Sequence, residues 1–198
     1  MRVLPSGPRA VLIELDSLEQ VMASTAAVRA LALPGVIEIV PAARTLLVCH
    51  AGIDLSPVMD AVASAPAVSP DDGPLVTIAV RYDGEDLAAV AASCELSTEE
   101  VVALHGSVEL RVAFCGFLPG FAYLVGLPSQ LHLPRLATPR QRVPAGAVAI
   151  AGEFASVYPS ASPGGWHLLG TTDAVMWDDR RDPPALLAPG TRVRFVLA

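Results

Sequence analysis

The fold is decided by the stretch Arg111–Thr172, which reads RVAFCGFLPGFAYLVGLPSQLHLPRLATPRQRVPAGAVAIAGEFASVYPSASPGGWHLLGTT. In this stretch glycine, proline and aromatic residues alternate with short apolar runs. Because proline fixes φ and lacks an N–H donor, while glycine admits positive φ, so dense a mixture rules out a long helix. The stretch instead predicts short strands, among them Val112–Phe114 and Val148–Ala151, joined by shaped loops at 116–121 and 162–166.

These loops hold aromatic rings in fixed places, which is a common way to build a binding surface. We therefore expect a substrate or partner contact made by Phe117, Pro119, Phe121, Tyr123, Pro144, Gly146, Tyr158, Gly164, Gly165 and Trp166. The alternative is that the rings of Phe117, Phe121 and Tyr123 fill a barrel core. The indole of Trp166 suits packing and ligand stacking equally well.

Two arginines of the same stretch follow prolines, in the sequence PRLATPR at 134–140. The prolines limit backbone freedom around Arg135 and Arg140, and two preorganised guanidinium groups suit a carboxylate or a phosphate. The alternative is that both arginines pair with acidic neighbours on the surface. We treat both as candidate catalytic or ligand-binding residues.

The third catalytic candidate is His105, which closes a predicted helix just before Gly106. A histidine there can serve as an acid or a base, but its cation would also interact favourably with the C-terminal end of the helix dipole. We interpret Glu85 and Asp86 as charges at a helix start. No nucleophile, base and acid stand close together in sequence, so only the fold could unite a catalytic set.

Upstream of residue 81, strands and helices alternate in a different pattern. The predicted strands are Ala10–Leu15, Val36–Val40, Thr45–Cys49 and Leu75–Tyr82, and the predicted helices are Leu18–Leu31 and Ser56–Ser64. Residues 65–74, rich in proline, serine and aspartate, predict a loop. The order strand–helix–strand–strand–helix–strand is typical of a ferredoxin-like α/β layer. The sequence therefore predicts two domains, 1–80 and 81–198.

The second domain begins with helices and ends with strands. Asp83–Ala92 predicts a short helix with an acidic first turn. Ser97, with Glu100 three residues later, forms a capping box that starts a second helix. Arg192–Leu197 predicts a final strand. Many short strands with glycine and proline turns favour a β-barrel, so the chain as a whole is expected to be α+β.

Composition narrows the class of protein. Of the 198 residues, 53% are hydrophobic, yet no apolar run reaches the roughly 18–20 residues that a membrane span needs. The first residues lack the apolar core of a signal peptide, so we expect a cytoplasmic protein without a membrane partner. The net charge of −7 argues against non-specific nucleic-acid binding.

The cations and cysteines exclude several chemistries. All 13 basic residues are arginines, which excludes a phosphate-loop lysine, a Schiff base and a biotinylated lysine within this chain. The three cysteines, Cys49, Cys94 and Cys115, are too widely spaced for a zinc site. We expect them to be buried free thiols, and we expect no metal ion.

A family resemblance rests on motifs that follow one another in a fixed order. They are GFLPGFAYL (116–124), two Pro-Arg pairs (134–135 and 139–140), VPAG (143–146), IAG (150–152), YP (158–159) and SPGGW (162–166). In order and spacing they are similar to the family called allophanate hydrolase subunit 1, or the Kip-inhibitor family, built from carboxyltransferase subdomains C and D. The similarity extends back to Tyr82–Leu87 and forward to Pro189–Val193.

The resemblance implies a cyclophilin-like β-barrel for the second domain. It implies work with a second chain, of the type called allophanate hydrolase subunit 2 or the C-type 5-oxoprolinase subunit. Most similar are the family's 5-oxoprolinase members, which open the lactam of 5-oxoproline to glutamate with hydrolysis of ATP. We therefore expect one chain of an ATP-dependent lactam- or amide-opening hydrolase, inactive alone. Two alternatives are a non-catalytic inhibitor of a histidine kinase and a part of a urea carboxylase-type carboxyltransferase assembly.

Overall fold

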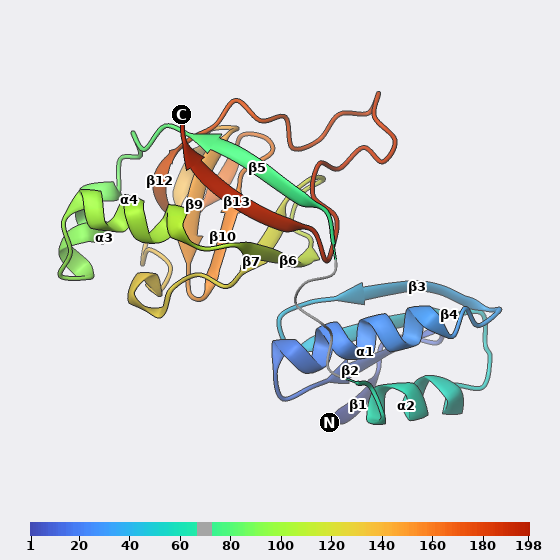
Figure 1. Ribbon diagram of the computed structural model, residues 1–198. Helices are drawn as coiled ribbons and strands as arrows, with labels where there is room; N and C mark the ends of the chain where they lie inside the picture. Colours follow the sequence, from blue (N-terminus) through green and yellow to red (C-terminus); the bar gives the residue numbers. More distant parts are fainter. Residues whose placement is uncertain (67–72) are drawn as a thin grey trace. The chain divides into compact units, whose positions relative to one another are not determined.

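The computed structural model describes residues 1–66 and 73–198, and it divides the chain into two units, Met1–Asp71 and Asp72–Ala198 (Figure 1). Most of the loop predicted at 65–74 lies outside the described residues. No helix among those residues is long and apolar enough to cross a membrane. The α+β class is confirmed.

The first unit is a four-stranded antiparallel sheet with two helices. Its elements are β1 (Arg2–Pro5), β2 (Ala10–Glu14), α1 (Leu18–Ala30), β3 (Val36–Pro41), β4 (Thr45–His50) and α2 (Ser56–Ala63). The strand order is β1-β2-β4-β3. Both helices cover one face of the sheet, because Ile13, Leu46 and Val48 on that face share one core with Val21 of α1 and Val58 of α2.

The predicted ferredoxin-like layer needs two corrections. The expected last strand, β5 (Leu75–Val80), belongs to the second unit, where it pairs with β13 (Arg192–Leu197). Its place at the edge of the first sheet is taken by β1, which pairs with β2 and which the proline-rich start of the sequence did not predict. The alternation of an apolar strand shows that it forms but not which strand it pairs with. The predicted boundary at residue 80 therefore falls late.

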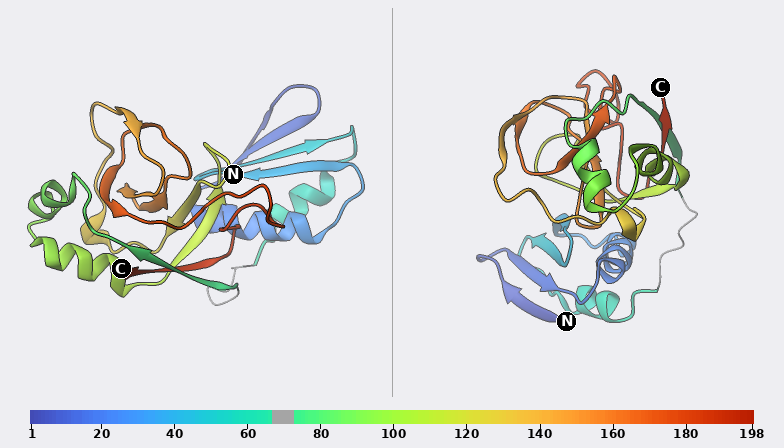
Figure 2. Two further views of the ribbon diagram at one scale, coloured as in Figure 1. Left: turned by 90° about the horizontal axis from the view of Figure 1, so that it is seen from above. Right: turned by 90° about the vertical axis from the view of Figure 1, so that its left-hand side faces the viewer.

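The second unit is built on a seven-stranded sheet that curls into a nearly closed barrel (Figures 1 and 2). The strand order is β12-β9-β10-β7-β6-β13-β5. The members not yet bounded are β6 (Leu110–Cys115), β7 (Ala122–Val125), β9 (Ala147–Ala151), β10 (Phe154–Val157) and β12 (His167–Thr171). A two-stranded sheet of β8 (Arg140–Val143) and β11 (Ser162–Gly164) accompanies it. The predicted β-barrel and the strands within 112–114, 148–151 and 192–197 are confirmed.

The two edges of the barrel sheet meet in a short seam. Arg81 follows β5 and bridges Thr171 of β12, each residue donating its N–H to the other's carbonyl at 2.8 Å. Gly84 N–H donates to Leu169 O at 3.1 Å. A Cβ at Gly84 or Gly170 would collide with the opposing backbone, so the close approach at the seam requires glycine at both positions.

The helix predicted at 83–92 starts later than expected, because α3 spans Leu87–Ser93. The preceding residues follow β12 instead. Asp86 N–H donates to Leu168 O at 3.2 Å, and the Asp86 carboxylate accepts the Leu168 N–H at 2.7 Å. Asp86 is the N-cap residue of α3, so the predicted acidic charge at a helix start is confirmed, but its carboxylate makes no cap hydrogen bond and instead joins the seam.

The second helix of this unit, α4 (Thr98–Ser107), begins as predicted. Ser97 Oγ accepts the Glu100 N–H at 3.1 Å, and the Glu100 carboxylate accepts the Ser97 N–H at 2.7 Å, which completes the capping box. Helices α3 and α4 lie next to each other at one end of the barrel (Figure 2, right). The helix end at 105–107 also agrees with the prediction.

We propose that the two units fold separately, and we expect residues 73–198 to fold on their own, whereas 81–198 should not. The shorter fragment lacks β5, which lines β13 along its whole length and buries Ile78 and Val80. Thermal melts followed by circular dichroism and limited proteolysis of both fragments test this. A cooperative melt of 81–198 at the midpoint of the longer fragment would contradict the expectation.

Candidate functional site

The glycine, proline and aromatic loops of the second unit enclose a pocket of about 210 Å³. The residues that line it are Phe117, Phe121, Tyr123, Arg135, Pro139, Tyr158, Pro163, Gly164, Gly165 and Trp166. Eight of these are predicted site residues, brought together from four separate segments. Pro139 and Pro163 were not predicted, although both stand inside the motifs that pointed to the site.

An aromatic cluster forms the floor and walls of this pocket. Phe121, just before β7, is buried and meets Tyr123, Tyr158 and Trp166 edge to face, with ring centroids 5.1–5.5 Å apart. Trp166 is only 4% exposed. Such contacts stabilise both the loops and the ring positions. The rings of Phe121 and Trp166 thus pack in a core and also form the wall of the pocket. Packing and ligand contact, which were alternatives from the sequence, are therefore compatible for these two rings.

Phe117 differs from the buried Phe121 and Trp166 in being 58% exposed. It is the middle residue of a tight turn in which Leu118 N–H donates to Gly116 O at 2.9 Å, and its φ is +73°. A three-residue turn with positive φ at its centre is the rare, strained form. The ring touches Phe121 edge to face, with centroids 5.3 Å apart. It therefore lies at the rim of the pocket rather than in a barrel core.

Arg135 is held over the face of Trp166, with its Cζ 5.9 Å from the ring centroid. Two hydrogen bonds fix the loop that carries it. Leu136 N–H donates to Gly165 O at 2.7 Å, and His167 Nε2 donates to Pro134 O at 2.8 Å. None of the ion pairs among residues 1–66 and 73–198 includes Arg135. The pocket therefore holds a positioned cation without a carboxylate partner in the described chain.

Two tyrosine hydroxyls belong to the same pocket. Burial raises the pKa of Tyr158, against the opposing effects of its hydrogen bond with the Trp166 backbone and of the nearby Arg135 cation. Burial also raises the pKa of Tyr123, again opposed by Arg135. Both phenols are consequently neutral at pH 7, and they offer hydrogen bonds rather than negative charge.

Arg140 does not line the pocket, contrary to its prediction as a catalytic residue. Its guanidinium forms ion pairs with Glu85 Oε1 and Asp86 Oδ1, both at 2.6 Å, and its side chain is 22% exposed. It also donates to Trp166 O at 3.5 Å. In the structure Arg140 therefore pairs with acidic neighbours, which was the alternative interpretation from the sequence. Arg140 fastens the seam segment to the wall of the pocket.

His105 does not reach the pocket either. It is fully buried on α4, stacked on Phe195 of β13 with ring centroids 4.6 Å apart, and its Nδ1 lies 2.8 Å from the Tyr82 hydroxyl. Burial lowers its pKa to about 4. The expected acid/base or helix-end role is not supported by these contacts. Val101 and His105 are the buried residues of α4, and their spacing of four was a sign that both face the core.

Three further predicted residues lie outside the pocket but shape nearby turns. Pro119 is exposed in the turn that follows Phe117. Pro144 and Gly146 connect β8 to β9, where Gly146 N–H donates to Tyr158 O at 2.8 Å and φ is +78°. A Cβ at Gly146 would collide with a backbone carbonyl oxygen. These residues support the loops and do not line the pocket.

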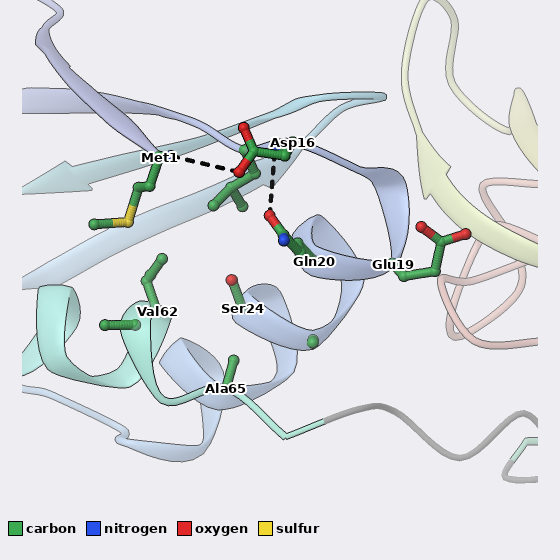
Figure 3. Close-up of a pocket in the computed structure, with 10 residues that line it drawn as sticks. Met1, Asp16, Glu19, Gln20, Ser24, Val62 and Ala65 are labelled. Atoms are coloured by element: carbon green, nitrogen blue, oxygen red, sulfur yellow. Dashed lines mark hydrogen bonds and ion pairs between the residues drawn. The ribbon is translucent and has the colours of Figure 1, made fainter.

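The first unit has a pocket of its own, of about 490 Å³, between the start of α1 and the end of α2 (Figure 3). Three of its lining residues contact one another: the Met1 amine lies 3.6 Å from the Asp16 carboxylate, and Gln20 Oε1 accepts the Asp16 N–H at 3.1 Å. Its described lining includes no arginine or histidine, so we regard the aromatic pocket as the candidate site.

The cysteines and the acidic residues suggest no further chemistry. Cys49, Cys94 and Cys115 are free thiols, as expected, although each is only partly buried. Within the described ranges, no group of three or more histidine, cysteine, aspartate or glutamate residues is arranged to hold a metal ion.

Comparison with known proteins agrees with this architecture. The profile of the carboxyltransferase domain, subdomain C and D, matches residues 1–187. A protein of Escherichia coli O157:H7, named as the B subunit of 5-oxoprolinase, is 43% identical over 204 residues, which cover 96% of this chain and 93% of that protein. The crystal structure of TTHA0988 has a TM-score of 0.82 and 37% identity over 96% of this chain, which spans 40% of the TTHA0988 chain.

A more distant structure shows the same fold. The urea amidolyase of K. lactis has a TM-score of 0.75 at 18% identity, over 99% of this chain and 15% of its own. The motifs that suggested the family lie in the loops of the aromatic pocket and in the turns that support them. From its match to the family profile over residues 1–187, this chain belongs to the family of the carboxyltransferase domain, subdomain C and D.

Proposed function

We propose that this chain is the B-type component of a 5-oxoprolinase, which converts 5-oxoproline, ATP and water to glutamate, ADP and phosphate. The observation that carries the proposal is the 43% identity with the E. coli protein of that name, which extends over nearly the full length of both chains. A similarity confined to one motif would support only that the two proteins share a loop. Because the similarity extends over both units, it supports a shared role with the E. coli protein.

We further propose that the chain works in the cytoplasm with a second chain, the C-type component of 5-oxoprolinase, and is inactive alone. The name of the E. coli relative marks it as one subunit among others. The fold also occurs joined to further sequence, since it makes up 40% of TTHA0988. The described lining of the pocket offers one cation and neutral phenols, but no nucleophile paired with a base. The second chain would therefore complete the catalytic set.

ATP does not fit the aromatic pocket. Its volume of about 210 Å³ is below the roughly 300–1,000 Å³ of pockets that bury drug-sized ligands. The chain also lacks a lysine for the phosphates. We therefore assign the nucleotide to another surface of the assembly.

The second candidate is a carboxyltransferase role in a urea carboxylase-type assembly, favoured by the fold shared with K. lactis urea amidolyase. A third is inhibition of a histidine kinase without catalysis. An 18% identity concerns the fold alone, whereas the E. coli relative is far more similar in sequence. The hydrolase role is therefore the better supported of the three.

Complementation tests the proposal. The gene is placed in E. coli cells that lack their own B-type component of 5-oxoprolinase, with 5-oxoproline as sole nitrogen source, and glutamate release is measured in extracts with and without added ATP. We expect growth and ATP-dependent release, and no release by the purified chain alone. Failure to restore either activity, from a chain that is folded and associated with the other host components, would contradict the hydrolase role.

A further inference from the structure

We propose that the aromatic pocket is a binding site for a small planar carboxylate, with Arg135 as the carboxylate ligand and Phe117 as a flap over the flat face of the bound molecule. The choice of 5-oxoproline as the probe rests on the proposed function. The site itself is inferred from the charge, shape and backbone conformation of the pocket.

Arg135 differs from the arginines around it in its partners. Other arginines near the seam, such as Arg81 and Arg140, are neutralised by carboxylates at 2.6–2.7 Å. Arg135 instead rests on the face of Trp166, and no ion pair of the described chain includes it. A guanidinium is a planar fork that binds a carboxylate with two parallel hydrogen bonds. An anionic ligand would complete what the protein leaves open.

The loop around Arg135 is preorganised by hydrogen bonds. The bonds Leu136 N–H to Gly165 O and His167 Nε2 to Pro134 O hold it on both sides of the arginine. A loop already ordered in the free protein loses less conformational entropy when a ligand binds. The guanidinium is thus presented at one place above the indole.

The aromatic pocket is small and is lined mostly by rings. A volume of about 210 Å³ has room for a single small ring with its substituents. The lining of Phe121, Tyr158 and Trp166 is aromatic and buried, which favours a flat, mostly apolar body. The Tyr123 phenol, half-buried in the same lining, can hydrogen-bond to an amide of that body.

Phe117 has an unusual backbone conformation. Its φ of +73° is one that residues with a Cβ adopt rarely and at a cost, whereas glycine adopts it freely. The ring obtained at that cost is 58% exposed, so it contributes little to the core. Strain of this kind, in an exposed aromatic at a pocket rim, points to a role in what the pocket binds.

Binding is measured by the fluorescence of Trp166 in the full chain carrying Trp177→Phe, which removes the other tryptophan, one that does not line the pocket. We expect 5-oxoproline to change the emission saturably. 2-Pyrrolidone, the same ring without the carboxylate, should bind roughly tenfold more weakly or worse. Equal affinity for the two compounds would overturn the carboxylate site.

Two matched arginine variants locate the charge. Arg135→Gln should weaken 5-oxoproline binding by roughly tenfold or more, with an unchanged melting temperature because the side chain is exposed. Arg142→Gln removes the same charge from an exposed position on β8 outside the pocket lining, and it should leave binding as it is. An equal loss in both variants would show a general effect of net charge and overturn the assignment.

Phe117→Gly distinguishes an effect of the Phe117 ring on ligand binding from an effect on the stability of the fold. The variant should bind 5-oxoproline several-fold more weakly, while its urea midpoint stays the same or rises, because glycine relieves the positive φ. Undiminished binding would overturn the flap. If the chain supports growth on 5-oxoproline but the purified chain does not bind 5-oxoproline, the carboxylate site is overturned and the proposed function still stands. If the purified chain binds 5-oxoproline but does not support growth, the proposed function is overturned and the carboxylate site still stands.

Discussion

Replacing Arg140 with methionine should lower the free energy of unfolding of the second unit by about 3–5 kcal/mol, the usual cost of removing one partner from a buried ion pair. The side chain of Asp86, only 11% exposed, would keep the Leu168 N–H as a partner and lose the guanidinium. Glu85 is largely exposed, so its lost pair adds little. The large effect comes from the uncompensated carboxylate of Asp86.

Urea unfolding of the full chain measures this change, with Arg142→Met as the control for loss of an exposed arginine. Arg140→Lys should lie between the two, because an ammonium keeps the charge but cannot bind both carboxylates as a planar fork. A normal urea midpoint for Arg140→Met would show that the ion pairs of Arg140 are not a source of stability.

Acidification should destabilise the second unit between about pH 6.5 and pH 4 through His105. Burial lowers the pKa of His105 from 6.5 to about 4, so in this window the unfolded chain binds a proton that the folded chain does not. The stability that depends on neutral His105 is therefore fully present above pH 6.5. It is lost as the pH falls from 6.5 to 4, and His105 causes no further loss below pH 4. At 1.36 kcal/mol per pKa unit, the loss is about 3 kcal/mol.

Carboxylates also titrate near the lower end of this window, so the comparison is between two proteins. His105→Phe preserves the stack on Phe195. Because the Tyr82 hydroxyl would lose its hydrogen-bond partner in that variant, Tyr82→Phe is added to remove the hydroxyl. We expect the double variant to lose clearly less stability between pH 7 and pH 4 than the natural chain. Parallel stability curves for the two would show that His105 is protonated in the fold.

The strands and helices were largely predictable because they depend on neighbours in sequence. The capping box at Ser97 and Glu100 and the apolar run that predicts a strand at Thr45–Cys49 are local signals, and both are confirmed. What could not be predicted is pairing between distant segments. Leu75–Val80 fits an apolar strand in either unit, and only its register with β13 decides. The late start of α3 likewise depends on Leu168, far away in the chain.

The site was predictable to a similar extent. Aromatic rings on glycine and proline loops identified most of the pocket lining, since those residue types restrict where a ring can go. The two arginines of PRLATPR looked alike in sequence but have different partners: one lies on an indole and the other on two carboxylates. Their difference arises from residues 85–86, which no local pattern joins to residue 140.

The pairing of β13 with β5 also sets an order of events during synthesis. The strand pairs of the first unit join residues that all lie between Arg2 and His50, so that unit can form soon after it leaves the ribosome. The barrel cannot: its parallel ladder pairs Arg192 with Leu75, and contacts so remote in sequence form slowly. Until β13 emerges, β5 and β6 present unpaired apolar edges, which is the period in which a nascent barrel is most exposed to aggregation and to chaperones.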